Sequence, residues 1–342
     1  MRPFLKIFFR IIPWILIIIF LAIGIGFKYK GIWKTFELSE DIKFPEDEGA
    51  HQWTDSEWWY FKTHLSDKLN PENIFGATMV FFKPGLLYLI VADIKNQKKY
   101  SAVSRKPFEI LSSDKLSLKI GNNYWTETDL FKYKINYEDE DIGLNFILEA
   151  IKKPMIVSDD PKSLIGIYLI QPRINVSGDL SLEGKKYEVD GLGWIDHQIS
   201  PGLNSESILE WKWWAVQLNN DIDLTFSDIL FAKEGEAGFE QYPLVVFNKN
   251  SSGFNFEKVP REKYTLEELN YWENPLSGIR YPISWLLEIP AKNITLEINS
   301  VLKDQVINGI SVYEGACRVN GIYGNVKVGG WAQFENVFHA KN

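Results

Sequence analysis

Glu57-Trp58-Trp59-Tyr60-Phe61 and, far downstream, Gly193-Trp194-Ile195-Asp196-His197 are the two stretches around which the chain is organised. Each places large aromatic side chains beside a titratable group, and a third aromatic run follows at Trp211-Lys212-Trp213-Trp214. The chain has 13 tryptophans, and six of them lie in these three runs. Such a cluster buries much apolar area and needs partners for its indole N–H groups. It therefore forms either the floor of a ligand cavity or the plug of a core.

Size, charge and cysteine content limit the classes of protein to consider. A chain of 342 residues is long enough for two domains after its N-terminal segment. The net charge of -8 argues against a nucleic-acid partner, because phosphate binding needs a basic patch. The lone cysteine, Cys317, excludes an internal disulfide and a cysteine-based metal site. With only four histidines, a multi-histidine metal site is disfavoured but stays open, and we expect neither a metal nor an organic cofactor.

The N-terminus predicts a membrane anchor. A basic flank, residues 1–10, precedes an anchor at 11–30 that begins with a long uncharged run, and a polar connector covers 31–43. The alternative is a cleaved secretory signal, with Ala22 and Gly24 as a weak cleavage pattern. The run is long for a signal core, which favours an uncleaved anchor. We therefore predict a single-pass membrane protein whose soluble part lies outside the cytoplasm.

Beyond the connector, nearly every segment has the pattern of a β-strand. Ile74–Phe82 and Leu86–Ala92 are apolar runs around a Lys-Pro-Gly turn, which predicts a hairpin. Trp211–Leu218 and Ile222–Leu230 flank Asn219-Asn220-Asp221 and form the clearest hairpin in the chain. The best helix candidate outside the anchor is 264–272. Strands at this spacing predict an all-β meander that closes as a barrel or packs as a sandwich.

A break near residue 200 divides this part of the chain. The strand pattern restarts after Pro201-Gly202. We therefore predict an N-terminal domain at 44–200 and a C-terminal domain at 201–342, both built of antiparallel strands.

His197 and Asp228 are the best candidates for chemistry. His197 follows Asp196 at the end of a predicted strand, and an imidazole titrates near neutrality. The alternative, a structural histidine, has equal weight on sequence alone. Asp228 lies in an apolar strand on the same face as Phe226, where desolvation would keep it protonated and able to act as a general acid. The commoner case for such a residue is an aspartate that faces solvent.

Three residues of the first aromatic stretch have alternative roles. Glu57 is either an acid or the buried partner of a cation such as Arg173, and pairing is favoured because an unpaired buried charge is too costly. Tyr60 and His64 lie four apart on one strand face, where they line a cavity or serve as ordinary strand residues.

The aromatic motifs resemble a known family. The motifs that carry the resemblance are Glu57-Trp58-Trp59-Tyr60, Pro172-Arg173, Gly191 to His197, Tyr281-Pro282 and Tyr313-Glu314-Gly315. In these motifs the chain resembles the carotenoid 1,2-hydratase (hydroxyneurosporene synthase) family, which includes the AttH-type lipocalin-like proteins of bacteria. Fungal pericyclases resemble this family in fold. The likeness covers nearly all of residues 44–335. Nucleotide-binding and serine-hydrolase motifs such as GxGxxG and GxSxG do not occur in the sequence.

The resemblance implies a fold, a chemistry and a site. The fold is two lipocalin-like β-barrel domains with an apolar cavity at or between them. In the hydratases an acid protonates an isoprenoid C=C bond and water captures the cation, which aromatic faces stabilise. The family pattern has a His, a Trp two residues later and a Tyr-x-Asp set. His197 and Asp228 match it, and Ile199 and Phe226 depart from it. The residues that we expect to contact the ligand are Trp58, Trp59, Tyr60, His64, Trp194, Trp213 and Phe226.

Two functions remain open on this sequence. The first is a membrane-anchored, cofactor-independent hydratase (a hydro-lyase) or isomerase acting on an isoprenoid or lipid, with Asp228 as acid and His197 as its partner. The second is a non-catalytic carrier of a hydrophobic ligand at the membrane. Such a carrier would serve a transport system as its partner. The departures at Ile199 and Phe226 favour the carrier, and the retention of His197 with Asp228 favours the enzyme.

Overall fold

The computed structural model describes residues 42–338 except 53, 55, 159–165, 201–207, 234–235, 242–243 and 249–254. Within these ranges the chain is almost entirely β-structure, and the prediction of an all-β fold is confirmed. The helical elements described are single 3-10 turns: η2 (Glu46–Glu48), η3 (Arg261–Lys263) and η4 (Pro290–Lys292). No helix in the described ranges has the length and apolar character needed to span a bilayer. The predicted anchor at 11–30 lies outside these ranges.

The first half of the chain forms one antiparallel sheet of twelve strands. Its order is β4-β3-β2-β1-β12-β11-β9-β8-β7-β6-β5, and β10 pairs with β11. The strands are β1 (Glu57–Asp67), β2 (Ile74–Phe82), β3 (Leu86–Asp93), β4 (Lys98–Arg105), β5 (Phe108–Ile110), β6 (Ser117–Ile120), β7 (Asn123–Asp129), β8 (Lys132–Glu138), β9 (Ile142–Ala150), β10 (Met155–Ser158), β11 (Ile167–Leu182) and β12 (Lys185–Ile199).

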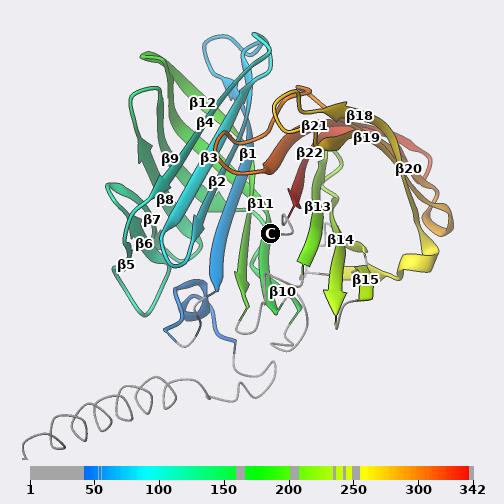
Figure 1. The fold of residues 1–342 in the computed structure, drawn as a ribbon, viewed down its shortest axis with the longest axis horizontal. Coiled ribbons are helices and arrows are strands. Elements are labelled where there is room, and N and C mark those ends of the chain that lie inside the picture. The colour runs from blue at the N-terminus through cyan, green and yellow to red at the C-terminus, as the bar shows by residue number, and fades with distance from the viewer. Residues whose placement is uncertain are drawn as a thin grey trace, which may run out of the picture.

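The second half forms a sheet of ten strands beside the first (Figure 1). Its order is β17-β16-β14-β13-β22-β21-β20-β19-β18, and β15 pairs with β14. The strands are β13 (Ile208–Leu218), β14 (Asp223–Lys233), β15 (Glu236–Gln241), β16 (Leu244–Asn248), β17 (Asn255–Val259), β18 (Thr265–Glu273), β19 (Arg280–Ile289), β20 (Ile294–Ser300), β21 (Val312–Tyr323) and β22 (Val326–Phe338). The two sheets curl as lipocalin-like half-barrels. This agrees with the lipocalin-like β-structure that the resemblance implied, although the sheets are half-barrels.

Both sheets follow one plan, in which the first strand of each half pairs with the last. β1 pairs with β12, and β13 pairs with β22, while most other neighbours are joined by short turns. The β1–β12 register places Trp59 opposite His197 and Tyr60 opposite Asp196. The two aromatic stretches, more than a hundred residues apart in sequence, are therefore direct neighbours at the centre of the first sheet.

Strand β1 has a different role on each of its two faces. Trp59 and Phe61 point into the apolar core of the first sheet. Tyr60 and His64 point the other way and contact Glu314 and Trp331 of the second sheet. Lys62 lies between them on that face and donates to Gln217 of β13. Because both faces are covered, the strand is buried along almost its whole length.

The predicted helix at 264–272 is wrong. Tyr264 directly follows η3, and the remaining residues belong to the edge strand β18, which pairs with β19 from Thr265 to Glu273. Leu266 and Trp272 pack against the core of the second sheet. Helix propensity in a short segment is a weak preference, and the exposed hydrogen-bonding edge of β19 overrides it.

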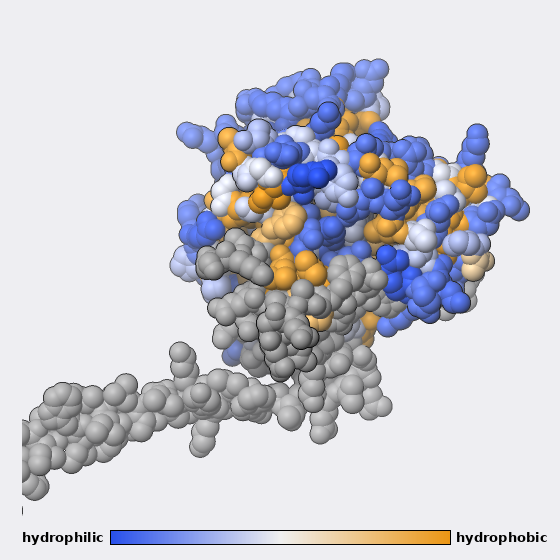
Figure 2. Space-filling model, turned by 45° about the vertical axis from the view of Figure 1, so that its right-hand side comes forward, coloured by the Kyte–Doolittle hydropathy of each residue, from blue (hydrophilic) through white to orange (hydrophobic). Residues whose placement is uncertain are grey.

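The surface mixes polar and apolar residues. Figure 2 shows hydrophobic groups separated by hydrophilic ones over the described part of the face that it draws. Exposed large apolar side chains such as Leu69 and Leu276 lie singly in turns, which is normal for a folded domain. The domain limits 44–200 and 201–342 stay a prediction.

Candidate functional site

A small pocket opens on the inner side of the first sheet. It has an empty volume of about 270 Å³, including the part open to solvent. Its wall comes from η2, β1, β8, β11, β12 and two loops, and consists of Glu48, Trp59, Leu116, Tyr133, Pro154, Leu169, Ile170, Gln171, Ile195 and His197.

Glu48 is the acidic group of this pocket. Its side chain is buried, and Tyr133 Oη lies 2.8 and 2.9 Å from its two carboxyl oxygens. Gln171 Nε2 donates to the same carboxyl group. Burial raises the pKa of Glu48 to about 8, and the hydrogen bonds from Tyr133 and Gln171 moderate that rise. At neutral pH the group is therefore a carboxylic acid with a proton to give.

Backbone geometry fixes Glu48 against the aromatic wall. The indole Nε1 of Trp59 donates to the backbone oxygen of Glu48 at 2.8 Å. The same indole ring stacks on two other rings. Its centroid lies 4.7 Å from that of His197 and 5.7 Å from that of Phe108. The acid, the aromatic face and the imidazole therefore form one rigid group around the pocket.

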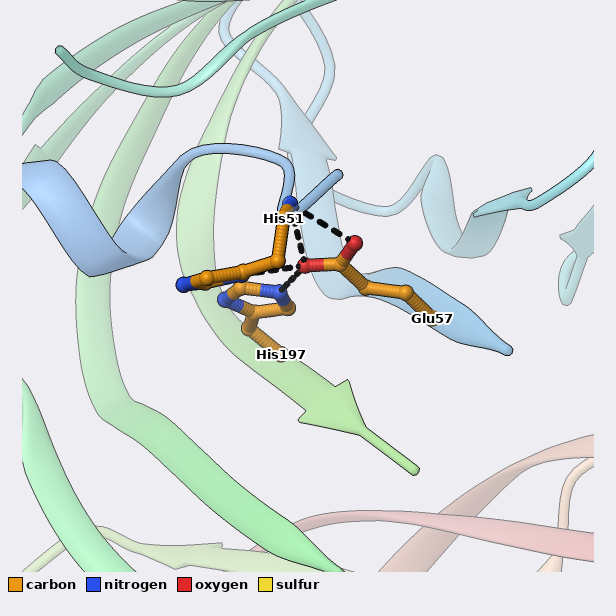
Figure 3. Close-up of side chains that lie close together, drawn as sticks. All are labelled: His51, Glu57 and His197. Carbon is orange, nitrogen blue, oxygen red and sulfur yellow. Dashed lines mark hydrogen bonds and ion pairs between the residues drawn. The ribbon is translucent and has the colours of Figure 1, made fainter. Parts of the chain in front are cut away.

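His197 is held by Glu57, beside His51. His197 Nε2 lies 2.9 Å from Glu57 Oε1, and His51 Nδ1 lies 2.7 Å from the same oxygen (Figure 3). His51 Nε2 lies 3.0 Å from Asp47 Oδ1. The second oxygen of Glu57 pairs with Lys83 Nζ at 3.1 Å. The favoured prediction for Glu57, a buried ion pair, is confirmed, but the suggested partner Arg173 is wrong.

The charges of this group follow from its contacts. Although burial alone would raise the pKa of Glu57, hydrogen bonds from His197 and His51 and their charges lower it to about 2. Burial would lower the pKa of His51, but Asp47 and Glu57 raise it to about 9. Burial lowers the pKa of His197, with Glu57 opposing. His197 Nδ1 is buried with no hydrogen-bond partner, so one nitrogen stays available beside the pocket.

These residues also form a candidate metal site. Among the described residues, His51, Glu57 and His197 are brought together with their ligand atoms within 4.8 Å of one another. Two imidazoles and one carboxylate are donors that first-row transition metals accept. No sequence pattern predicted this site, because its three donors become neighbours only when β1 pairs with β12.

Most of the predicted ligand-contacting residues lie elsewhere, between the two sheets. Tyr60 donates to Glu314 at 2.6 Å, and its ring meets Trp213 edge-on at 5.2 Å. Trp194 donates to Asp196 at 2.6 Å, and Trp213 donates to Tyr168 Oη at 2.9 Å. These contacts make an aromatic and acidic layer that joins the sheets.

The remaining predicted residues occupy three further places. Trp58 is half-buried and stacks on Phe82 at 5.4 Å. His64 stacks on Trp331 at 4.5 Å. Phe226 stacks on Trp214 at 4.8 Å in the core of the second sheet. Of the predicted ligand contacts, Trp59 lies in the pocket wall.

Asp228 is not brought to His197. It lies half-buried on β14 of the second sheet, opposite Lys212 in register, whereas His197 bonds Glu57 in the first sheet. Burial and the nearby charge of Asp228 raise the pKa of Tyr264. Asp228 therefore belongs to a separate group of polar side chains.

Glu48 and Tyr133 were missed in the sequence. Glu48 is one of three consecutive acids shortly after the connector, and nothing local separates it from Glu46, which is exposed. Tyr133 is an ordinary aromatic position in an alternating strand. The position of both in one pocket comes from the curl of the sheet.

Two glutamates share the layer between the sheets. Tyr88 Oη lies 3.3 Å from Glu314 and 3.5 Å from Glu335, and Gln333 donates to Glu314 at 3.0 Å. Burial, together with repulsion from Glu335, raises the pKa of Glu314 well above its usual value. Burial raises the pKa of Glu335 to about 7, although hydrogen bonds from Tyr88 and Glu314 oppose that rise. At least one of the two is therefore protonated near neutral pH.

This pair makes stability depend on pH. The folded protein binds more protons than the unfolded chain between the ordinary glutamate pKa, about 4.3, and the raised folded value. The free energy of unfolding is therefore expected to fall as pH rises from about 4.3 to about 7. Glu335→Gln removes one charge with little change of shape and is expected to flatten this fall by on the order of 1–3 kcal/mol.

Urea unfolding at several pH values measures the effect. Glu273→Gln, at an exposed strand position, is the matched control and should keep the slope of the wild type. An unchanged slope in Glu335→Gln would contradict a shared proton between the two glutamates.

Comparisons with known proteins give one family and several related folds. The AttH-like family model matches residues 88–335. No curated protein matches the chain. The AttH protein NE1406 of Nitrosomonas europaea is 18% identical, with a TM-score of 0.70 over 89% of this chain and 98% of that one. Kievitone hydratase from Nectria haematococca is 14% identical, with a TM-score of 0.69 over 87% and 93%.

A third structure shares the fold at lower similarity. CghA in complex with Sch210972 is 9% identical, with a TM-score of 0.57 over 87% of this chain and 96% of that one. At these identities the three likenesses show a common fold that spans both sheets.

Proposed function

Since the chain belongs to the AttH-like family, as its aromatic motifs predicted, we propose that it is a hydratase that adds water to a C=C bond of a hydrophobic substrate by acid catalysis. The substrate class is an isoprenoid or related lipid whose reacting end enters the pocket. The observation that carries the proposal is the buried carboxyl group of Glu48, which lies in the pocket wall beside Trp59 and bonds Tyr133. Burial raises its pKa to about 8, which favours the protonated form.

Glu48 takes the role of the acid in this proposal. The pocket brings it together with His197, whereas Asp228 lies in the other sheet. Tyr133 and Gln171 fix its orientation through their hydrogen bonds. A carboxyl group kept neutral by burial is suited to protonate a weakly basic carbon.

The reaction balances with these residues. The O–H bond of Glu48 breaks and its proton forms a C–H bond with one alkene carbon, which leaves a tertiary carbocation and the Glu48 carboxylate. The cation forms beside the aromatic wall of the pocket, which includes Trp59 and Tyr133. A water at His197 Nδ1, the buried atom without a partner, forms the C–O bond and gives its proton to the Glu48 carboxylate. Loss of a different proton from the cation would give an isomer instead.

The anchor belongs to the same proposal. We propose that residues 11–30 hold the protein at the membrane, with the body outside the cytoplasm, so that a lipid substrate enters the pocket without crossing water. Protease treatment of intact spheroplasts tests this side of the membrane. Protection of the body from the protease would place it in the cytoplasm.

Mass spectrometry of a bound or converted lipid tests the activity. The full chain is expressed in a host that makes acyclic carotenoids and other isoprenoids, purified in detergent and extracted. The co-purified lipid is then incubated with fresh protein in ¹⁸O-labelled water. A product that gains one labelled water supports the hydratase. An isomer of unchanged mass, or an unmodified lipid that binds and persists, overturns hydration in favour of isomerisation or of a carrier.

A further inference from the structure

We propose that His51 Nδ1, Glu57 Oε1 and His197 Nε2 bind one divalent transition-metal ion, with zinc as the best fit. The three atoms lie within 4.8 Å of one another and their residues are almost wholly buried. They come from three segments: the loop before β1, the first residue of β1 and the end of β12 (Figure 3). The metal-binding inference does not depend on the hydration reaction.

The two imidazoles already aim at one point. His51 Nδ1 and His197 Nε2 lie 2.7 and 2.9 Å from the same oxygen of Glu57. Zinc binds imidazole nitrogen at about 2.0–2.1 Å and carboxylate oxygen at about 2.0–2.2 Å. An ion bound there displaces Glu57 Oε1 from its present position, and the two imidazole rings move closer together to reach these bond lengths. Three protein ligands leave a fourth position for water, as in catalytic zinc sites.

The surroundings fix the ligands in place. Asp47 Oδ1 accepts from His51 Nε2 at 3.0 Å, which is the outer carboxylate that metal-binding histidines usually have. The ring of His197 is clamped between Trp59, at 4.7 Å, and His51, at 5.9 Å between centroids. Trp59 and His197 are opposite each other in the β1–β12 register, so the pairing of these two central strands holds their rings together.

One neighbour opposes a cation. Lys83 Nζ pairs with Glu57 Oε2 at 3.1 Å and also donates to the backbone oxygens of His51 and Thr54. Its positive charge lowers the affinity of the site without occupying a ligand atom that faces the histidines. The hydrogen bonds among the three ligands compete with the ion in the same way. We therefore expect that removing the Lys83 charge strengthens binding and that removing either histidine weakens it strongly.

The donor set selects the metal. Two nitrogens and one oxygen suit zinc, cobalt and related ions, whereas calcium and magnesium prefer sites made entirely of oxygen. An ion here would lie one imidazole ring away from the pocket, because His197 belongs to both. The site would therefore tie the loop at His51 to the wall of the pocket.

Metal titration of the full chain in detergent tests the proposal. Protein freed of metal with a chelator is titrated with Zn²⁺ by calorimetry and with Co²⁺ by visible absorption. We expect one ion per chain. His51→Ala or His197→Ala is expected to weaken binding by more than about 100-fold, and Asp47→Asn by about 10- to 100-fold. Lys83→Met is expected to tighten binding by about tenfold, because it removes a like charge.

The controls separate binding from misfolding. His64→Gln changes a buried histidine that stacks on Trp331, away from the three ligands, and should leave the affinity unchanged. Thermal unfolding of each variant shows whether it is folded, and Asp47→Asn changes a residue near the surface that should tolerate substitution. Wild-type protein with no saturable Zn²⁺ or Co²⁺ binding would overturn the proposal. Binding that survives in both His51→Ala and His197→Ala would overturn it as well. Neither result bears on hydration, which the labelled-water experiment decides.

Discussion

Glu48→Gln is expected to lower the hydration rate by about 100- to 10,000-fold, which is the range that a positioned general acid contributes. Glutamine keeps the shape of the side chain and can still bond Tyr133, so the substrate should bind within a few-fold of the wild type. Glu46→Gln, two residues earlier and exposed, is the matched control and should retain the wild-type rate. Full activity in Glu48→Gln would remove this residue from the mechanism.

The pH profile gives a second test of the same acid. Only the protonated form of Glu48 can give a proton, so the rate should fall as pH rises through about 8. Tyr133 donates to this carboxyl group and thereby lowers its pKa. Tyr133→Phe is therefore expected to move the alkaline fall in rate to higher pH. A fall that stays in place would show that another group controls the profile.

Asp223→Asn is expected to reduce the free energy of unfolding by about 3–5 kcal/mol, because it removes the buried carboxylate that pairs with two buried cations. Of the described carboxylates, Arg173 then keeps only the partly exposed Asp221, 3.4 Å from its Nη1. Asp223, on β14, is wholly buried and accepts from Arg173 Nη2 of β11 at 2.7 Å. Lys152 Nζ lies 2.6 Å from its other oxygen. These contacts join the two sheets, so their loss should destabilise both.

Urea unfolding followed by tryptophan fluorescence measures this loss. Glu188→Gln breaks an exposed pair with Lys68, in which the two side chains are 60% and 36% exposed, and should leave the free energy of unfolding nearly unchanged. Lys152→Met in the Asp223→Asn background removes one of the stranded charges and should restore part of the stability. A loss below about 1 kcal/mol in Asp223→Asn would mean that solvent reaches these cations.

Local patterns were sufficient to predict the strands. The hairpin of β2 and β3 follows from two apolar runs around a turn, and that of β13 and β14 follows from Asn219-Asn220-Asp221. Both signals act within a few residues, so they survive any tertiary arrangement. The helix prediction for the segment that forms β18 was wrong for the opposite reason, because the secondary structure of this segment depends on pairing with the neighbouring strand β19.

The candidate site was predicted only in part. His197 was identified because an imidazole beside aromatic residues is visible in sequence. Its partner was not, because Glu57 and His197 lie 140 positions apart and meet through the β1–β12 pairing. Asp228 matched a pattern, but its strand lies in the other sheet.

The sequence by itself therefore determined the class of fold, the family and the aromatic stretches, since these depend on period-two alternation, turn residues and motifs that are local. Only the tertiary structure decided which acids are buried, and hence which hold a proton. Glu46 and Glu48 are the same residue type two positions apart, yet Glu46 is exposed and Glu48 is buried beside Tyr133 in the pocket wall. Desolvation is a property of the surroundings in space, so the pKa that makes Glu48 an acid arises when the sheet curls around it.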